Sequence, residues 1–346
     1  MADRRAAGRV RICDIAREAG VSPATVSNVL SGRRQIDSQA GRRVLDIAGR
    51  MGYERKAAPP ARRAIRFVLY RKHGLVVMDT PFFSELIAGI EQACRARNYE
   101  LIMNYMSPED APLRAPGDEC AAILLLATEM DGRELAGFTA CHVPVLVLDN
   151  HMEGAPMESV AIDNVAAGAL AVRHLLGNGH RRIGLIRSSV DFNNMAQRES
   201  GWRLALDEAG LPSCQEDVYS VEPTMEGAHR DMKRLINTRG LPRVTAFFAG
   251  NDIMAVGAAR ALKEAGIRLP EDISLVGMDD MPVCRAVEPP LTTLRVDKNA
   301  LGALAVERLI DMTEHGLGAP RKTLLGVTLI RRESVKCLQA MDGARG

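Results

Sequence analysis

Four pairs of adjacent polar residues stand directly after short apolar runs of the sequence. They are Asp149-Asn150, Asp163-Asn164, Asn251-Asp252 and Asp279-Asp280. Gathered in one cleft, such groups can bind the hydroxyls of a sugar or the ring nitrogens of a base, whereas clustered carboxylates can also hold a metal or act as an acid/base pair. Each acid can equally cap the helix that follows it. Because no His or Cys stands beside them at ligand spacing and no nucleophile motif accompanies them, we favour binding and expect no enzyme activity, metal or cofactor.

The elements that must position these pairs alternate between apolar runs and helical patterns. The expected strands are Arg66–Tyr70, Leu101–Tyr105, Ala121–Ala127, Pro144–Leu148, Ser159–Ile162, Arg182–Ile186, Thr245–Ala249, Ile273–Gly277 and Thr292–Val296. The expected helices are Ser84–Arg97, Val165–Leu176, Met195–Ala209, Gly227–Thr238, Ile253–Glu264 and Lys298–Glu314. This alternation predicts an α/β body with two doubly wound, parallel-sheet subdomains. In such sheets ligands bind at the carboxyl ends of the strands, which is where the polar pairs lie.

The N-terminal segment has apolar residues at helical spacing instead. They are Ile12, Ile15, Ala16 and Ala19 in a first helix, and Val44, Ile47, Ala48 and Met51 in a third helix that Ser38 would cap. Gly20 ends the first helix, and Ser22 can cap a second helix from Pro23 to about Leu30, because proline at the first helical position needs no N–H partner. Three short helices with a tight turn between the first two predict an all-α, DNA-reading helix-turn-helix head.

The second helix of this head would pack one face on the first helix and turn the other toward DNA. Val26, Val29 and Leu30 form the packing face. On the opposite side, Asn28 can donate to and accept from one adenine edge in the major groove, the alternative being an ordinary solvated asparagine. Pro23 and Ala24 share that side. The residues suited to phosphate contacts are Ser22, Thr25, Ser27, Arg33 and Arg34.

Charge is distributed unevenly along the 346 residues. Residues 1–63 hold 14 Lys and Arg against 6 Asp and Glu, whereas residues 64–346 hold 31 against 37. A positive head favours approach to a polyanion, although charge alone fits DNA, RNA or an acidic membrane. We find no apolar run of about 18 residues, no signal peptide and no C-x-x-C pair. We therefore expect a cytoplasmic, nucleoid-associated protein that does not enter the membrane.

The segment from Ile12 to Gly32, ICDIAREAGVSPATVSNVLSG, resembles the head of the LacI/GalR repressor family. The resemblance continues through the body in DTPFF (79–83), GHRRI (179–183), R-x-x-GW (198–202), AGND (249–252), VGMDD (276–280) and PLTTL (290–294). It covers nearly the whole chain. It implies a transcriptional regulator, most often a repressor, that binds a pseudo-palindromic double-stranded operator as a homodimer. It also implies a body similar to periplasmic sugar-binding proteins, with a small-molecule effector of the carbohydrate class.

The same resemblance assigns site residues. Those matching Pro23, Ala24 and Asn28 face base edges, and the effector cleft is lined at Asp149, Arg198, Asn251 and Asp279. Arg198 is the most specific of these, because a guanidinium fork makes paired hydrogen bonds to neighbouring oxygens. Phe82 and Phe83 can offer a ring face to the ligand, with at most one of them expected in the cleft.

Domain limits follow from these patterns: a head at 1–56, a linker at 57–64 and an effector domain at 65–340. Subdomain 1 is expected at about 65–163 and 293–325, and subdomain 2 at about 164–292 and 326–340. The linker departs from the family, because any hinge helix must start at Pro60 or be absent and no leucine wedge is present, so we expect weak DNA kinking. Arg62 is expected to contact DNA there.

Two further departures bear on the ligand and on assembly. The region around Glu222 lacks the aromatic that stacks a sugar ring in some relatives, which leaves the ligand class open. After Cys337 no heptad tail follows that would join dimers into tetramers.

Overall fold

The computed structural model describes residues 12–30, 39–51, 53, 63–77, 81–110, 120–152 and 154–338, without the side chains at positions 24, 27, 28, 30 and 39. The chain divides into two compact units, Met1–Ala61 and Arg62–Gly346. The expected hinge at Pro59-Pro60, the third-helix cap at Ser38 and the DNA contacts at Arg33, Arg34 and Arg62 lie outside the described residues. None of the helices in these ranges combines the length and apolarity needed to cross a bilayer.

The first unit consists of three helices around one small core. They are α1 (Ile12–Ala19), α2 (Pro23–Leu30) and α3 (Gln39–Arg50). The buried core side chains are Ile15, Ala16, Ala19, Val26, Val29, Val44, Ile47 and Ala48. Gly20 has a φ of +66°, the left-handed conformation that lets the chain turn sharply after α1. The three expected helices are thereby confirmed, and so are their apolar faces for the described side chains, which do not include that of Leu30.

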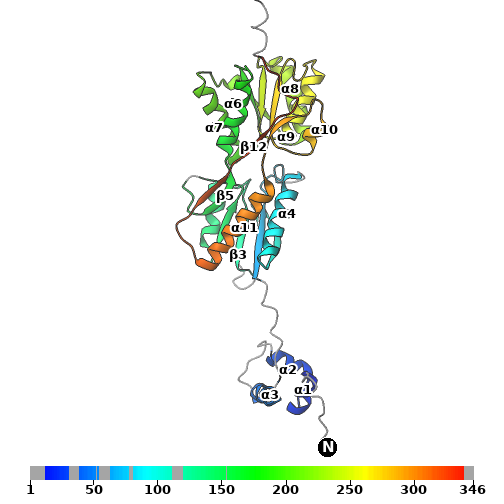
Figure 1. Ribbon diagram of the computed structural model, residues 1–346, viewed down its shortest axis with the longest axis vertical. Helices are drawn as coiled ribbons and strands as arrows, with labels where there is room; N and C mark the ends of the chain where they lie inside the picture. The colour runs from blue at the N-terminus through cyan, green and yellow to red at the C-terminus, as the bar shows by residue number, and fades with distance from the viewer. Residues whose placement is uncertain are drawn as a thin grey trace, which may run out of the picture. The chain divides into compact units, whose positions relative to one another are not determined.

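The second unit contains two six-stranded sheets (Figure 1). The first sheet comprises β1 (Arg63–Tyr70), β2 (Tyr99–Met106), β3 (Ala122–Leu126), β4 (Val145–Leu148), β5 (Glu158–Ile162) and β11 (Lys322–Leu325), in the order β11-β5-β4-β3-β1-β2. The second comprises β6 (Ile183–Ser188), β7 (Val218–Val221), β8 (Ala246–Ala249), β9 (Ser274–Asp279), β10 (Thr292–Arg295) and β12 (Thr328–Ile330), in the order β12-β10-β9-β8-β6-β7. All neighbouring strands are parallel except β10 and β12. The predicted pair of doubly wound, parallel-sheet subdomains is confirmed.

Helices cover the sheets on both faces. The helices are α4 (Pro81–Ala96), α5 (Gly132–Ala136), α6 (Asn164–Gly177), α7 (Asn193–Glu208), α8 (Met225–Arg239), α9 (Asp252–Glu264), α10 (Val283–Ala286) and α11 (Lys298–His315), with short 3-10 turns at Gly137–Ala140 and Gln215–Asp217. In Figure 1, α6 and α7 (green) flank the second sheet on one side, and α8 and α9 (yellow) flank it on the other. α4 packs on α11 against the first sheet.

The structure adds strands that the sequence patterns did not predict. β7, β11 and β12 all lie at the edges of their sheets. An edge strand has a neighbour on one side only, and these three are short and carry exposed or half-exposed positions, so they lack the apolar run used for prediction. The subdomain limit is also corrected: β10 pairs with β9 in the second sheet, so the chain returns to the first subdomain after Arg295 rather than at about residue 293.

The position of α7 follows from one glycine and one tryptophan. A Cβ on Gly201 would lie 2.1 Å from the carbonyl oxygen of Val165, so the backbones of α6 and α7 touch there. Trp202 is fully buried, and its indole N–H donates to the carbonyl oxygen of Ile183 at 3.0 Å. These two contacts fix the rotation of α7 and place Arg198, one turn earlier, toward the carboxyl edge of the second sheet.

Candidate functional site

A small cavity of about 50 Å³ lies where the carboxyl ends of the two sheets face each other. Its lining residues come from both subdomains: Val76, Phe82, Phe83, Thr128, Asp149, Phe192, Asn194, Arg198, Pro223, Asn251, Ile253, Asp279 and Met281. The structure therefore brings together all six residues that the sequence singled out for ligand binding, although they are spread over some two hundred positions of the chain. Residues at strand ends meet here because parallel strands end at a common edge.

Asp149 follows β4 and is buried, with its backbone in the left-handed region at a φ of +56°. The Thr128 hydroxyl donates to its Oδ2 at 2.7 Å, and the side-chain nitrogen of Asn194 donates to its Oδ1 at 3.2 Å. Burial raises the pKa of Asp149 to about 6, although the hydrogen bond from Thr128, the charge of Arg198 and the hydrogen bond from Asn194 all act in the opposite direction. The carboxylate is thus positioned by both subdomains at once.

Arg198 is buried on α7 and is held within the second subdomain. Its Nε donates to Oδ1 of Asn164 at 2.9 Å, and Nη1 donates to the carbonyl oxygen of Gly250 at 2.6 Å. The adjacent acid Glu199 does not pair with it, because Glu199 instead accepts from Arg187 at 2.8 Å and from Arg203 at 2.6 Å. The guanidinium is therefore fixed in orientation at the cavity wall without being neutralised by a neighbouring acid on its own helix.

Asp279 ends β9 and presents a carboxylate to the cavity. Its backbone φ of +111° lies outside the conformations that a residue with a side chain ordinarily adopts. Burial raises its pKa to about 7, which the charge of Arg198 opposes and the charge of Asp252 reinforces. Its Oδ1 is buried and has no hydrogen-bond partner among the described residues. Strain and an unpaired acceptor at one position are typical of functional sites.

The other members of the polar pairs have structural roles. Asp163 caps α6 by accepting from the Ala166 N–H, and Asn251 caps α9 by accepting from the Met254 N–H while it also lines the cavity. The remaining structural members are Asn150, Asn164, Asp252 and Asp280, each bonded to neighbouring loops or side chains. Across the part of the chain described here, no three His, Cys, Asp or Glu side chains are placed to hold a metal ion.

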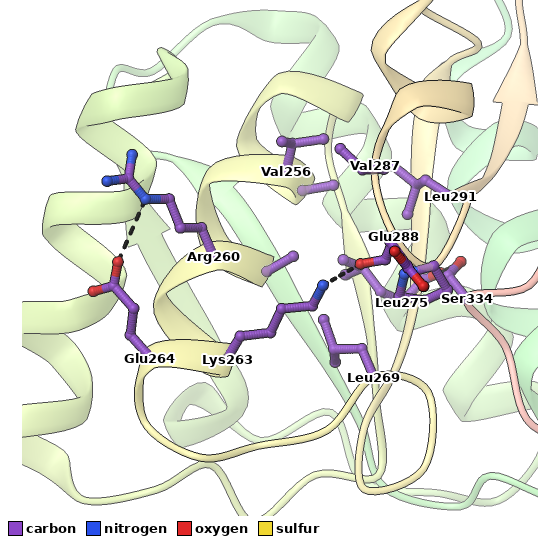
Figure 2. A pocket seen from close by; sticks show the side chains of 13 residues that line it. Val256, Arg260, Lys263, Glu264, Leu269, Leu275, Val287, Glu288, Leu291 and Ser334 are labelled. Atoms are coloured by element: carbon purple, nitrogen blue, oxygen red, sulfur yellow. Dashed lines mark hydrogen bonds and ion pairs between the residues drawn. The ribbon is translucent and has the colours of Figure 1, made fainter.

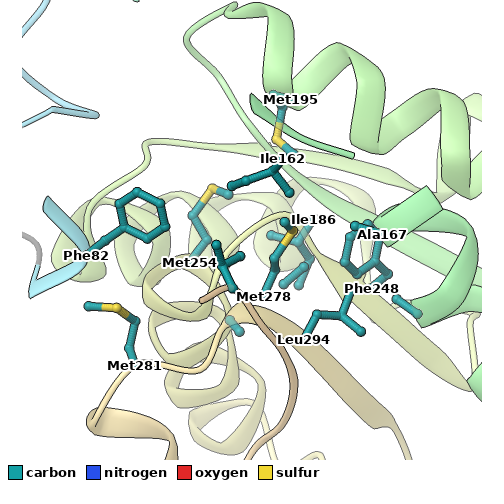
Figure 3. Close-up of a cluster of buried hydrophobic side chains, with 14 of the residues drawn as sticks. Phe82, Ile162, Ala167, Ile186, Met195, Phe248, Met254, Met278, Met281 and Leu294 are labelled. Carbon is teal, nitrogen blue, oxygen red and sulfur yellow. The ribbon is translucent and has the colours of Figure 1, made fainter. Parts of the chain in front are cut away.

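Phe82 and Phe83 both line the cavity, so the expectation that at most one of them would reach it is wrong. Their rings meet edge to face, with centroids 5.1 Å apart, and both are buried. Phe82 belongs to the same buried cluster as Met254 and Met281 of the second subdomain, as Figure 3 shows. Because the cavity is narrow, the Phe82 ring both lines it and packs in the hydrophobic core.

Several lining residues escaped the sequence analysis. Thr128 could have been found by the rule that pointed to Asp149, since it follows the apolar run that forms β3. Asn194 and Phe192 come several residues after β6, where the strand-end rule gives no signal. Phe192 supplies an aromatic ring to the cavity from a loop other than the one around Glu222.

A second and larger cavity of about 320 Å³ lies on the second subdomain beside α9 (Figure 2). It shares no lining residue with the cleft. Apolar side chains such as Val256, Leu275 and Val287 form its floor. At its rim, Lys263 donates to the backbone carbonyl of Glu288. The lining of this groove is mainly apolar, and its charged residues include Arg260, Lys263, Glu264 and Glu288.

In the head, the start of α2 has the expected capping geometry. Oγ of Ser22 accepts from the Thr25 N–H at 3.1 Å and lies 2.9 Å from the Thr25 hydroxyl oxygen. Ser22 and Pro23 are exposed, as contacts with DNA require. Positions 24, 27 and 28 fall on α2, whose side chains at 26 and 29 are buried, so the helix turns its other side outward.

Comparison with known proteins agrees with this architecture. Residues 11–56 match the family of bacterial regulatory proteins of the lacI type, and residues 172–335 match the periplasmic binding protein-like domain. The transcriptional regulator GalS of Salmonella typhimurium is 33% identical over 94% of this chain and 96% of its own length. The ribose operon repressor of Haemophilus influenzae is 30% identical over 94% of this chain and 98% of its own length.

Solved structures give the same result for the fold. The transcriptional regulator CelR in complex with cellobiose superposes with a TM-score of 0.71 at 27% identity, covering 94% of this chain and all of the other. The lac repressor dimer bound to operator and the anti-inducer ONPF superposes with a TM-score of 0.72 at 24% identity, covering 95% of this chain and 100% of the other, and shows the fold alone.

A helix-turn-helix head joined to a two-subdomain, periplasmic-binding-protein-like body defines a DNA-binding transcriptional regulator. The chain belongs to the lacI family of bacterial regulatory proteins. Its relatives are named as transcription regulators and repressors, not as enzymes.

Proposed function

We propose that this regulator is a repressor whose operator affinity is controlled by a small molecule of the carbohydrate class bound in the cleft. The observation that carries the proposal is a pair of buried acceptors on cavity-lining residues, Oδ1 of Asp279 and Oδ1 of Asn194, which have no hydrogen-bond partner in the part of the chain that the structure describes. A buried acceptor left without a donor costs roughly 1–3 kcal/mol, so a ligand that donates there recovers this free energy. Sugar hydroxyls are such donors, and the names of the ribose operon repressor and of the CelR complex with cellobiose support this ligand class.

The apolar part of the cleft suits the same class of ligand. Phe82, Phe83 and Phe192 offer ring surfaces that can cover the C–H face of a sugar ring. The present volume of about 50 Å³ is far below the roughly 300 Å³ of an ordinary small-molecule site, so the ligand must bind with the subdomains further apart. Ligand binding would therefore change the separation of the subdomains, and only such a difference between states can shift an operator-binding equilibrium.

For DNA, we propose that the outward face of α2 enters the major groove. Pro23, Ala24 and Asn28 would face base edges, and the contacts to phosphates would come from Ser22, Thr25, Ser27, Arg33, Arg34 and Arg62. Because one head reads only a short half-site, we propose a homodimer on a pseudo-palindromic operator, in which the two-fold axis of the protein matches that of the DNA.

The surfaces that a second copy would cover are apolar and exposed. On the edge strand β2, Met103 is 40% exposed and Tyr105 is 61% exposed. The groove of Figure 2, with Val256 and Val287, offers a further apolar surface. The lac repressor, which has the same fold, binds its operator as a dimer. Val256→Asp should therefore shift the protein toward monomer in light scattering after size exclusion, whereas Leu204→Asp, at an exposed leucine on α7, should leave the dimer intact.

We infer also that the cleft binds its ligand without converting it. Within the described residues, its lining contains no Ser, Cys, His or Lys side chain, and of its two carboxyl groups Asp149 is already held by hydrogen bonds from Thr128 and Asn194. The names of the relatives support the same inference. Incubation of the protein with D-ribose, D-galactose, cellobiose or adenine should leave each compound unchanged, and turnover of any of them would contradict this part of the proposal.

The decisive experiment for the whole proposal combines ligand screening with operator binding. Those four compounds would first be tested for their effect on the melting temperature, because a ligand selective for the folded state raises it. A compound that does so would then be titrated against the complex of the protein with its operator. The proposal requires that a sugar changes operator affinity; stabilisation by adenine alone would overturn the carbohydrate assignment.

A further inference from the structure

The carboxylate of Glu129 is buried and surrounded by backbone N–H groups of a single loop. Glu129 comes directly after Thr128, beyond the end of β3, and is 5% exposed. The N–H donors to its Oε2 are Lys72 at 2.6 Å, His73 at 2.8 Å and Gly74 at 3.3 Å, and those to its Oε1 are Val76 at 3.0 Å and Val77 at 3.2 Å. One side chain therefore satisfies five donors between residues 72 and 77.

The loop that Glu129 holds leads from β1 toward the effector cleft. Val76 lines the cavity, and the neighbouring Val77 is buried in the core beneath it. The start of the loop is fixed separately, since Nζ of Lys72 lies 3.0 Å from both Asp131 Oδ2 and Glu134 Oε1. Residues 72–77 contain no regular helix or strand, so the carboxylate replaces the backbone partners that secondary structure would provide.

The charge state of Glu129 suits this role. Burial is the largest single influence and acts to raise its pKa, but the N–H donors of His73, Val76, Lys72 and Val77 together outweigh it, so the pKa of Glu129 lies below its ordinary value. The side chain is therefore ionised at neutral pH, and charge-assisted hydrogen bonds of this kind are stronger than neutral ones. A glutamine would offer one acceptor oxygen and turn an NH₂ group toward N–H donors.

We propose that Glu129 is a positioning residue of the effector cleft, which holds residues 72–77 in place so that Val76 forms a preformed wall of the cavity. Two adjacent residues link this wall to the Asp149 carboxylate. Thr128 donates a hydrogen bond to Asp149, and Glu129 accepts hydrogen bonds from the loop at residues 72–77. Preorganisation of this kind raises ligand affinity by removing the entropy that a loose loop would lose on binding. The inference rests on the proposed function of the cleft, but its first test does not.

Glu129→Gln tests the proposal, with Asp217→Asn as a matched control. Asp217 is also buried and also bonded, to Nε and Nη2 of Arg182, but it contacts neither the loop nor the cavity. Amide hydrogen exchange at residues 72–77 would be measured without ligand for both variants. We expect at least tenfold faster exchange at these amides in Glu129→Gln and no change there in Asp217→Asn, even where both variants melt at lower temperature.

The second measurement is affinity for whichever of D-ribose, D-galactose and cellobiose stabilises the wild type. Glu129→Gln should bind it about tenfold more weakly while its operator affinity without sugar stays unchanged, whereas Asp217→Asn should bind it like the wild type. Unchanged exchange at 72–77, or unchanged sugar affinity, would overturn the proposal. If none of the sugars binds the wild type, the proposed ligand class fails, and the exchange measurement alone then decides whether Glu129 holds the wall.

Discussion

The side-chain nitrogen of Asn194 lies 3.0 Å from the carbonyl oxygen of Asp149 and 3.2 Å from its Oδ1, so a residue of α7 is bonded to a strand end of the opposite sheet. Asn193 and Gln197 extend this contact, since both donate to the carbonyl oxygen of His151, at 2.6 Å and 3.0 Å. The first two turns of α7 thus hold residues 149–151 across the cleft. Asp149 is also a candidate ligand contact. The same residue therefore takes part in holding the two subdomains together and in binding the ligand.

Asn194→Ala should therefore weaken the closed arrangement of the two subdomains. The variant loses one hydrogen bond to the Asp149 carboxylate, of a kind that contributes roughly 1.5–3 kcal/mol, and one to the Asp149 backbone carbonyl, of a kind that contributes roughly 0.5–1.5 kcal/mol. We expect a larger radius of gyration in X-ray scattering. For a sugar that stabilises the wild type we expect about tenfold weaker binding, because the variant also loses the cavity-lining Oδ1 acceptor of Asn194 to which the sugar would donate.

Asn178→Ala is the control for this change. Its side-chain nitrogen donates to the carbonyl oxygen of His174 at 2.8 Å within the same subdomain. It should lose stability without expansion, and an equal radius of gyration for Asn194→Ala and wild type would show that the amide is not what holds the cleft closed.

Asp279→Asn should stabilise the protein at high pH. The pKa of Asp279 is raised from 3.8 to about 7, so the folded protein keeps a proton there that the unfolded chain has released. A group with a raised folded pKa contributes stability that is lost as the pH rises through that pKa, here between about pH 4 and pH 7. The asparagine has no such proton to lose, so its melting temperature should exceed that of the wild type at about pH 8 and approach it near pH 5. A variant that is destabilised equally at both pH values would contradict this account.

Much of the fold and of the candidate site could be predicted from local patterns. Asp149, Asn251 and Asp279 stand where an apolar run ends, and parallel strands bring such ends together whatever their separation along the chain. The same rule could not tell which member of each polar pair would face the cavity. That choice depends on tertiary contacts: Asp279 and Asp280 both have a positive φ, yet Asp280 accepts a hydrogen bond from Arg295 and does not line the cavity.

The residues that sequence reasoning missed owe their place to tertiary contacts. Asn194 reaches Asp149 only because Gly201 and Trp202 set the rotation of α7. Val76 reaches the cavity through the hydrogen bonds that its loop makes to Glu129, more than fifty residues away. No local pattern records such pairings. The edge strands β7, β11 and β12 were missed for a related reason, because they pair on one side only and lack an apolar run of their own. The edge strand β2 has such a run and was predicted.

Gly201→Ala should displace α7 and lower stability. The added Cβ would lie 2.1 Å from a backbone carbonyl oxygen of α6, which cannot move aside as a flexible side chain would. Overpacking of this kind costs roughly 1–3 kcal/mol or more in the free energy of unfolding. Gly177→Ala is the control, since its Cβ would meet nothing within 4 Å and alanine favours a helix by about 0.5–1 kcal/mol. Chemical denaturation of both variants measures the difference, and equal stability would show that α6 and α7 adjust without strain.

Asn28→Ala should lower affinity for the specific operator by roughly 1–3 kcal/mol and leave non-specific DNA affinity nearly unchanged, because a carboxamide that reads a base edge contributes only where that base is present. The position lies on α2, directly before the buried Val29. Fluorescence anisotropy with operator and with scrambled DNA makes the comparison. An equal loss on both would assign Asn28 to phosphate contact.

Arg198→Ala should separate ligand sensing from DNA binding. The guanidinium is fixed by Asn164 and Gly250 at the cavity wall, within the body and far along the sequence from α2, so its removal should leave operator affinity without ligand unchanged. If Arg198 also binds the effector, the variant should need on the order of a hundredfold higher sugar concentration than the wild type for the same response. The reason is that charged hydrogen bonds contribute roughly 1.5–3 kcal/mol each. The loss of Arg198 also leaves the carbonyl of Gly250 without this donor, so a lower melting temperature is expected in either case and does not discriminate. Titration of sugar against the operator complex discriminates between the two roles. An unchanged sugar concentration at the midpoint would show that Arg198 is not part of the effector site and is a structural residue of the second subdomain.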